Sequence, residues 1–242
     1  MTVLSAQDVG ISFGSNHVLK SVNFEVGEAE VLGVIGPNGA GKTVMLNILS
    51  GIYKPSSGTV HFMGNDITHM KIVDRVKHGL ARTFQIPRSF EHMTTYENVM
   101  VGGVYGRKLS EREAGRQAQE ILERIGLGPR MNDMAGQLAL LDRKRLEIGV
   151  AMASHPKLLM LDEVAGGLTE SEIANVISIV KDVKQQGTSV IWIEHVLQTM
   201  VDGTDRVMCL AEGHDVITGL PQEVMESKVV SDVYLGADED ED

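Results

Sequence analysis

Apolar residues follow two different periodicities along the chain. Over residues 1–87 and again over 157–242, short continuous apolar runs alternate with helical patterns. The clearest runs are predicted to be buried strands: Val31–Ile35, "KLLMLD" from Lys157, "SVIWIEH" and "RVMCLAEG". Strands that alternate with helices are typical of a mostly parallel sheet covered by helices. The pattern therefore predicts an α/β fold for these two parts of the chain.

The segment between them, residues 88–156, has a helical pattern and no convincing strand. One helical face in it is apolar and carries Ala114, Ala118, Ile121, Leu122 and Ile125. Helix starts are indicated by S/T-x-x-E boxes, in which the hydroxyl and the carboxylate each accept a hydrogen bond from the other residue's backbone N–H. These boxes are Thr94 with Glu97, Ser110 with Glu113 and, beyond the segment, Thr169 with Glu172. We therefore expect a helical subdomain inserted into one α/β core.

Composition excludes several classes of protein. The formal net charge is -11, so no basic surplus exists to neutralise the phosphates of a bound nucleic acid. The single cysteine, Cys209, excludes an internal disulfide and fits a reducing cytoplasm. We expect no signal peptide, and no apolar run reaches the ~20 residues that a membrane helix needs. A role at a membrane would therefore require a membrane-spanning partner. The last seven residues, "GADEDED", are predicted to form a solvated tail.

A phosphate-binding loop is indicated between the first buried strand and the helix after it. Residues 36–43 read "GPNGAGKT" and match G-x-x-x-x-G-K-[ST]. In such a loop, glycines let backbone N–H groups surround the β-phosphate at the positive end of the helix. Lys42 would bridge the β- and γ-phosphate oxygens, and the Thr43 hydroxyl would ligate Mg²⁺. The alternative, a chance glycine-rich turn, does not account for the flanking strand and helix. The expected nucleotide-binding residues are Gly36, Asn38, Gly39, Gly41, Lys42 and Thr43.

Polar side chains follow three other predicted strands. Asp162 ends "KLLMLD", where a carboxylate can hold Mg²⁺, and Glu163 beside it can polarise an attacking water. Two acids in this position would otherwise cap the next helix, but the phosphate loop favours the catalytic interpretation. His195 follows "WIE", and Gln85 ends "ARTFQ". Taken alone, His195 would be a structural histidine and Gln85 a surface glutamine. At a shared sheet edge, His195 would come within reach of the γ-phosphate, and Gln85 would place an amide near Mg²⁺ and the attacking water.

These motifs, in this order, resemble the nucleotide-binding subunits of ATP-binding-cassette (ABC) transporters over about residues 3–236. The matching stretches are "GPNGAGKT", "TFQ", "RLEI", "LLMLDE" and "EH". The resemblance implies an ATPase that uses ATP and Mg²⁺, with an N-terminal antiparallel β portion. It also implies that Phe13 stacks on adenine, that Gln85 links the metal site to the helical subdomain, that Glu163 is the catalytic base and that His195 senses the γ-phosphate. The implied Mg²⁺ ligands are Thr43, Gln85 and Asp162.

Three further stretches resemble a narrower group. "FQIPRSFEHMTTYENVMVG", "DEVAGGL" and "VVSDVYLG" are similar to the ATP-binding subunits of bacterial branched-chain amino-acid importers and of related urea and short-amide importers. This resemblance implies uptake of a small polar nutrient, powered from the cytoplasmic face of the bacterial inner membrane. The implied partners are transmembrane permeases docked on the segment after Gln85, a second ATP-binding subunit, identical or different, and indirectly a secreted substrate-binding protein.

One expected motif departs from the family. In the family, a Leu-Ser-Gly-Gly-Gln signature loop contacts the ATP of the partner subunit, and its position corresponds to Leu138, 24 residues before Asp162. Here the loop reads Leu138, Ala139, Leu140, Leu141 and Asp142. Losing the serine hydroxyl removes a hydrogen bond of about 1.5–3 kcal/mol, leucines crowd the phosphate, and Asp142 adds like charge. A helix N-terminus and the cations Arg143 and Lys144 would offset these losses.

Alternative functions remain open at this point. We favour an importer ATPase in which the altered loop is a tolerated variant within an asymmetric pair of ATP-binding subunits. The altered loop equally motivates a switch that binds ATP and dimerises but hardly hydrolyses it. An ATPase of a lipid or lipopolysaccharide exporter is a further alternative, because the energy-coupling subunit does not reveal transport direction. DNA-repair and translation ATPases fit poorly, since they carry long coiled coils or two cassettes.

Overall fold

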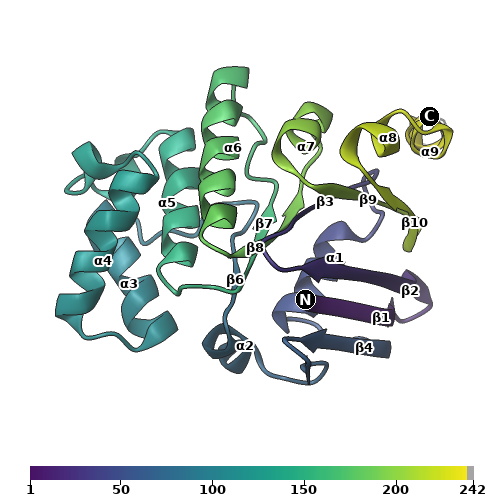
Figure 1. Cartoon of the computed structure of the whole chain (residues 1–242), viewed down its shortest axis with the longest axis horizontal. Helices are drawn as coiled ribbons and strands as arrows, with labels where there is room; N and C mark the ends of the chain where they lie inside the picture. The colour runs from purple at the N-terminus through teal and green to yellow at the C-terminus, as the bar shows by residue number, and fades with distance from the viewer. Residues whose placement is uncertain (239–242) are drawn as a thin grey trace.

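The larger of two β-sheets runs through the middle of the molecule, the smaller lies at the lower right of the view, and α3, α4 and α5 gather beside the β6 edge of the larger one (Figure 1). The structure is a computed structural model that describes residues 1–238. The strands are β1 (Thr2–Phe13), β2 (Asn16–Gly27), β3 (Val31–Ile35), β4 (Ser57–Phe62), β5 (Asn65–Asp66), β6 (Leu80–Arg82), β7 (Leu158–Asp162), β8 (Ser189–Ile193), β9 (Arg206–Ala211) and β10 (His214–Gly219). The helices are α1 (Lys42–Ser50), α2 (Ile72–His78), α3 (Thr95–Arg107), α4 (Glu111–Arg124), α5 (Leu140–Met152), α6 (Glu170–Gln185), α7 (Leu197–Gly203), α8 (Pro221–Met225) and α9 (Lys228–Asp238), with the 3₁₀ turns η1 (Gly128–Arg130) and η2 (Ala135–Gln137).

The larger sheet has the strand order β10-β9-β3-β8-β7-β6. Its neighbours from β9 to β6 pair in parallel, and β10 joins the edge antiparallel. The smaller sheet, β2-β1-β4-β5, is antiparallel throughout. Both the mostly parallel core and the N-terminal antiparallel portion are therefore confirmed.

Successive residues of the central strands enter two different hydrophobic cores. In β7, Leu159 and Leu161 pack in a core shared with helices α3 to α6. Leu158 and Met160 face the other way, into a core shared with α1 and the smaller sheet. Side chains alternate across a strand, so a strand covered on both faces must be apolar at every position. This burial explains the continuous apolar runs of the sequence.

The predicted helical segment contains α3, α4 and α5. All three S/T-x-x-E boxes form reciprocal caps, at the starts of α3, α4 and α6. The predicted apolar face of α4 is buried, with Ala114 at 1% and Leu122 at 0% exposure. Between residues 88 and 156 of the described chain, the single β pairing is an isolated bridge from Thr94 to Met134. The helical character of the segment is confirmed, whereas its independence as a subdomain stays a prediction.

The C-terminal end differs from its prediction. Helix α9 continues to Asp238, so the first three residues of the expected solvated tail are helical. Residues 239–242 lie outside the described part of the chain. The side chain of Val230, near the start of α9, is 4% exposed and belongs to the core, which ties this helix to the rest of the molecule. None of the helices within residues 1–238 is long and apolar enough to cross a membrane.

Candidate active site

The segments that follow four adjacent strands meet at one edge of the larger sheet. Strands β3, β8, β7 and β6 are neighbours in that order, and all pair in parallel. Parallel neighbours present their carboxyl ends at the same edge, which is where ligands bind in such sheets. The segments after these strands carry the phosphate loop, His195, Glu163 and Gln85 respectively. Segments far apart in the sequence therefore come together there.

The carboxylate of Glu163 is the meeting point of the predicted catalytic side chains. Gln85 Nε2 donates to Glu163 Oε2 at 2.5 Å, and His195 Nε2 lies 2.6 Å from Glu163 Oε1. An ionised carboxylate only accepts, so the histidine nitrogen donates in this pairing. The backbone of Glu163 has φ of 51°, a left-handed conformation that costs a non-glycine residue on the order of 1–3 kcal/mol. Such strain concentrates at functional sites.

The phosphate loop requires its glycines and buries its lysine. Gly36 has φ of 147°, and a Cβ atom there would overlap the carbonyl oxygen of Leu210. Lys42 Nζ donates to the carbonyl oxygens of Gly36 at 2.6 Å and Pro37 at 2.9 Å. Burial lowers the pKa of Lys42, and the carboxylates of Glu163 and Asp162 oppose that shift. The lysine thus lies on the loop itself, beside the acidic residues. Asn38, Gly39 and Thr43 are exposed at the same loop, whereas Gly41 is buried.

Asp162 has one oxygen engaged and one free. Its Oδ2 forms an ion pair with Arg82 Nη2 at 2.7 Å, and both side chains are buried. Arg82 also donates to Asn47 Oδ1 at 2.6 Å. Within the described chain, Asp162 Oδ1 is buried without a hydrogen-bond partner. Burial raises the pKa of Asp162, and Arg82 opposes the rise. Arg82 was missed because nothing in "ARTFQ" indicates a partner 80 positions away.

The free oxygen of Asp162 suits a hard divalent cation. Mg²⁺ prefers oxygen ligands, and the hydroxyl of Thr43 and the amide oxygen of Gln85 are of the same kind. Across residues 1–238, no cluster of three or more His, Cys, Asp or Glu side chains is placed to hold a metal ion by itself. A Mg²⁺ ion here would therefore need phosphate oxygens to complete its coordination, as is usual for nucleotide sites.

Phe13 lies at the end of β1 with its ring accessible. The side chain is 47% exposed, and its ring packs edge-to-face on Tyr53 with centroids 5.3 Å apart. An exposed aromatic face is what stacking on adenine requires, and that role stays a prediction. Tyr53 was not predicted as its partner.

The loop 138–142 combines a buried start with an open helix end. Leu138 is 4% exposed, whereas Leu140 is 46% exposed. Ala139 is the N-cap of α5 and provides no side-chain cap, so the first N–H groups of the helix are not occupied by a capping side chain. Asp142 is paired at 3.2 Å with both Arg130 and Arg145. These two arginines neutralise the negative charge that Asp142 adds to the loop.

The two cations after this loop donate hydrogen bonds to backbone carbonyl oxygens of their own chain. Arg143 donates to the carbonyl oxygens of Leu138 at 2.9 Å and Gly136 at 2.6 Å. Lys144 is 5% exposed and donates to the carbonyl oxygen of Gly166 at 2.5 Å. Both side chains therefore bind their own chain, and the expectation that they offset the altered loop is wrong. Their partners are backbone atoms, which no side-chain motif indicates.

Glu147 connects α5 with the segment before Gln85. Its Oε1 accepts a hydrogen bond from Phe84 N at 2.7 Å, and burial raises the pKa of Glu147 to about 7. The sequence analysis assigns "RLEI" no site role, because nothing in the stretch indicates a partner 63 positions away. This hydrogen bond joins the helix that begins with loop 138–142 to the residue next to Gln85.

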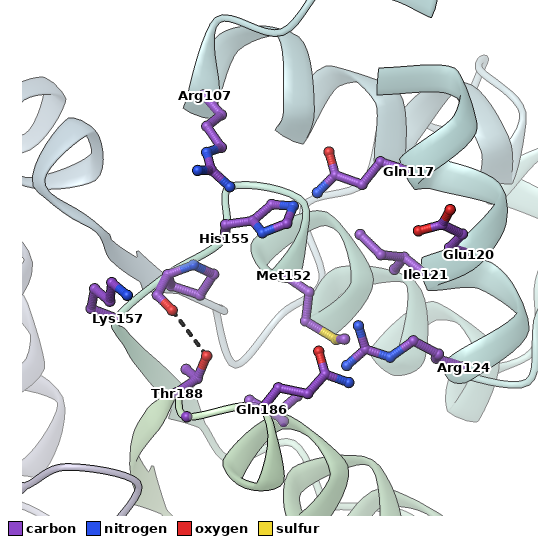
Figure 2. Close-up of a pocket in the computed structure, with 13 residues that line it drawn as sticks. Arg107, Gln117, Glu120, Ile121, Arg124, Met152, His155, Lys157, Gln186 and Thr188 are labelled. Atoms are coloured by element: carbon purple, nitrogen blue, oxygen red, sulfur yellow. Dashed lines mark hydrogen bonds between the residues drawn. The ribbon is translucent and has the colours of Figure 1, made fainter. Parts of the chain in front are cut away.

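A separate pocket of about 370 Å³ lies between α4, the α5–β7 connection and the start of β8 (Figure 2). Arg107, His155 and Lys157 face it, and Thr188 Oγ1 donates to the carbonyl oxygen of Pro156 at 2.9 Å. None of the predicted site residues lines this pocket. The pocket lies where β7 and β8 begin, whereas the predicted site residues follow the ends of these strands, so the two are separate.

The chain is similar to known proteins over nearly its whole length. A high-affinity branched-chain amino acid transport ATP-binding protein, LivG of Salmonella typhimurium, is 32% identical, with 97% of this chain and 98% of LivG covered. The lipopolysaccharide export system ATP-binding protein LptB of Haemophilus influenzae is 28% identical, with 98% of each covered. A crystal structure of a nucleotide-free ATP-binding cassette from an ABC transporter superposes with a TM-score of 0.88 at 26% identity, covering 97% of this chain and 99% of that one. Residues 19–166 match the ABC transporter family. The chain belongs to the ABC transporter family and is one of its ATP-hydrolysing cassettes.

Proposed function

We propose that this chain is the ATPase subunit of an importer for branched-chain amino acids or a similar small polar nutrient. The observation that carries the proposal is the convergence of Gln85 and His195 on the two carboxylate oxygens of Glu163, beside the phosphate loop. The relatives named for branched-chain amino acid transport support the substrate class.

The side chains of the site divide the chemistry among them. Lys42 and the loop N–H groups hold the β- and γ-phosphates of ATP, and Phe13 stacks on the base. Thr43, Gln85 and Asp162 would hold Mg²⁺, which would neutralise part of the negative charge of the phosphates. Glu163 accepts the proton of the attacking water, and His195 orients this carboxylate and contacts the γ-phosphate.

The exposed segment after Gln85 suits a permease. Ile86 is 78% exposed and Phe90 is 54% exposed, so two large apolar side chains lie exposed close together in one short segment. We assign this surface to membrane-spanning permease subunits, which would hold the chain at the cytoplasmic face of the bacterial inner membrane. A substrate-binding protein would act on the other side.

A second ATP-binding subunit would face loop 138–142. The uncapped start of α5 would offer N–H groups to the phosphates of the ATP bound by the partner subunit, in place of the absent serine hydroxyl. Whether this partner is a second copy or a different cassette determines which ATP this loop contacts. Because the loop lacks its serine and glycines, we favour a different cassette.

Two other functions compete with the importer. The 28% identity to an exporter subunit, LptB, supports lipopolysaccharide or lipid export. The altered loop supports an ATP-dependent dimerisation switch with weak hydrolysis. Turnover of ATP in the assembled transporter separates the switch from both transport functions.

The experiment is affinity purification from the membranes of the native host, with a tag on this chain, followed by uptake of radiolabelled leucine by cells carrying Lys42→Ala. We expect permeases and a second cassette in the purified complex and a loss of uptake in the variant. The exporter function predicts unchanged leucine uptake together with altered lipopolysaccharide or lipid at the cell surface.

A further inference from the structure

Two buried ionisable side chains hold the backbone of the loop that carries Glu163. Lys144 Nζ donates to the carbonyl oxygens of Glu163 at 3.2 Å and Gly166 at 2.5 Å. Glu194 Oε1 accepts from the N–H of Ala165 at 2.5 Å. The lysine belongs to α5, and the glutamate directly follows β8 and precedes His195. Residues 163–166 are thus hydrogen-bonded from two different elements.

Burying a charge on either side chain is unfavourable unless hydrogen bonds compensate for the lost hydration. Lys144 is 5% exposed and Glu194 is 1% exposed. A charged group taken from water is unfavourable without hydrogen bonds to replace its hydration, and apolar side chains would fill the same space without that cost. Besides the loop, Glu194 Oε1 accepts from Trp192 Nε1 at 3.1 Å. Within residues 1–238, all other hydrogen bonds of the two side chains are to the backbone of residues 163–166. Holding this backbone is therefore the role that their contacts indicate.

The backbone of residues 163–166 is strained at Glu163, the proposed general base. Glu163 has φ of 51°, a conformation that relaxes when the surrounding structure does not enforce it. Its carboxylate must meet Gln85 and His195 simultaneously. A change of φ at Glu163 would rotate the side chain away from one or both of them.

We propose that Lys144 and Glu194 are positioning residues for ATP hydrolysis, which fix the backbone of residues 163–166 so that the Glu163 carboxylate keeps its place. Lys144 lies about one turn into α5, whose first three residues, 140–142, are the end of loop 138–142. A displacement of the start of α5 therefore reaches Glu163 through the lysine. This inference rests on the proposed function, in which Glu163 is the general base.

The test measures ATP hydrolysis by the transporter complex, purified through a tag on this chain. Lys144→Met removes the donor, and Glu194→Leu removes the acceptor. Glu194→Gln keeps an amide oxygen that can accept from Ala165 N. We expect each disruptive variant to lower kcat by about 10- to 100-fold, as small misplacements of catalytic groups do. The affinity for a non-hydrolysable ATP analogue should stay within about twofold, and Glu194→Gln should keep most of the activity. Lys181→Met, at an exposed lysine of α6, is the matched control.

A second arm combines Lys144→Met with Glu163→Gln. If the lysine acts through Glu163, adding Lys144→Met to Glu163→Gln lowers the residual rate no further. Wild-type kcat in Lys144→Met, or an equal further loss in the Glu163→Gln background, overturns the inference. Should Lys144→Met not fold, the comparison of Glu194→Leu with Glu194→Gln decides in the same way. Wild-type turnover in Glu163→Gln alone would instead overturn the proposed function. This single variant therefore distinguishes a failure of the proposed function from a failure of the positioning role.

Discussion

Nε2 of His195 and Oε1 of Glu163 lie 2.6 Å apart, although 32 positions separate the two residues in the chain. The pairing limits the orientations open to the Glu163 carboxylate, because Gln85 holds its other oxygen. A general base is effective only when it is aimed at the proton that it takes. In the proposed mechanism the histidine acts on the rate in two ways, by orienting the base and by contacting the γ-phosphate.

His195→Ala should lower kcat for ATP hydrolysis by about 10²-fold, because it removes both contributions. ATP affinity should change little, since the phosphate loop holds most of the triphosphate. Steady-state hydrolysis by the purified transporter complex measures kcat, and equilibrium binding of a non-hydrolysable analogue measures the affinity. A variant with wild-type kcat would remove His195 from the mechanism.

Ala139→Ser restores the hydroxyl that the family's signature loop carries. Because the open start of α5 already presents N–H groups, we expect turnover in the complex to change by less than about threefold. A rise of about tenfold or more, equivalent to the missing hydrogen bond, would support the weakly hydrolysing switch instead. The measurement is ATP turnover of the complex carrying the variant, with the unaltered complex beside it.

Arg75 is a buried cation that stabilises the fold away from the active site. It is 1% exposed and donates to five backbone carbonyl oxygens, which belong to Ile48, Leu49, Ile67, Thr68 and Met70. Burial lowers its pKa to about 10. Arg75→Met removes these five hydrogen bonds from a buried site and should reduce the free energy of unfolding by about 3–5 kcal/mol.

Urea denaturation of the full chain measures this loss. Lys77→Met on the same helix is the control, because Lys77 is exposed and its ion pair with Asp74 is at the surface. Such pairs contribute less than about 1 kcal/mol. If the two variants were equally stable, the arginine would not have the structural role that its contacts indicate.

Glu194 should make stability depend on pH. Burial raises its pKa from 4.5 to about 7, so the folded chain keeps this proton in a range where the unfolded chain has lost it. The stabilisation is therefore complete below pH 4.5 and is lost as the pH rises to about 7. Glu194→Gln lacks this titration, so its unfolding free energy relative to wild type should rise by roughly 2–3 kcal/mol from pH 4.5 to 8.

Glu147, whose pKa is also raised to about 7, is present in both proteins and cancels in the difference. Urea denaturation at several pH values provides the curve. A difference that stays constant with pH would mean that Lys144 keeps Glu194 ionised throughout.

The positions of the candidate site residues at strand ends could be predicted, and the buried ionisable side chains beside them could not. Asp162, Glu163 and His195 each follow an apolar run, so the parallel sheet brings them to one edge. Arg82 and Lys144 instead bind atoms 80 and 22 positions away, and the targets of Lys144 are carbonyl oxygens that every residue has. Such contacts depend on how the helices pack on the sheet, which periodicity does not specify.

ATP hydrolysis by Glu163→Gln tests the central claim most directly, namely that this pocket binds ATP with Lys42 and cleaves it with Glu163 as the base. We predict that kcat in the transporter complex falls by about 10²–10⁴-fold, while affinity for ATP is unchanged. Unchanged turnover, or the absence of ATP binding by the folded wild-type chain in calorimetry, would contradict the account.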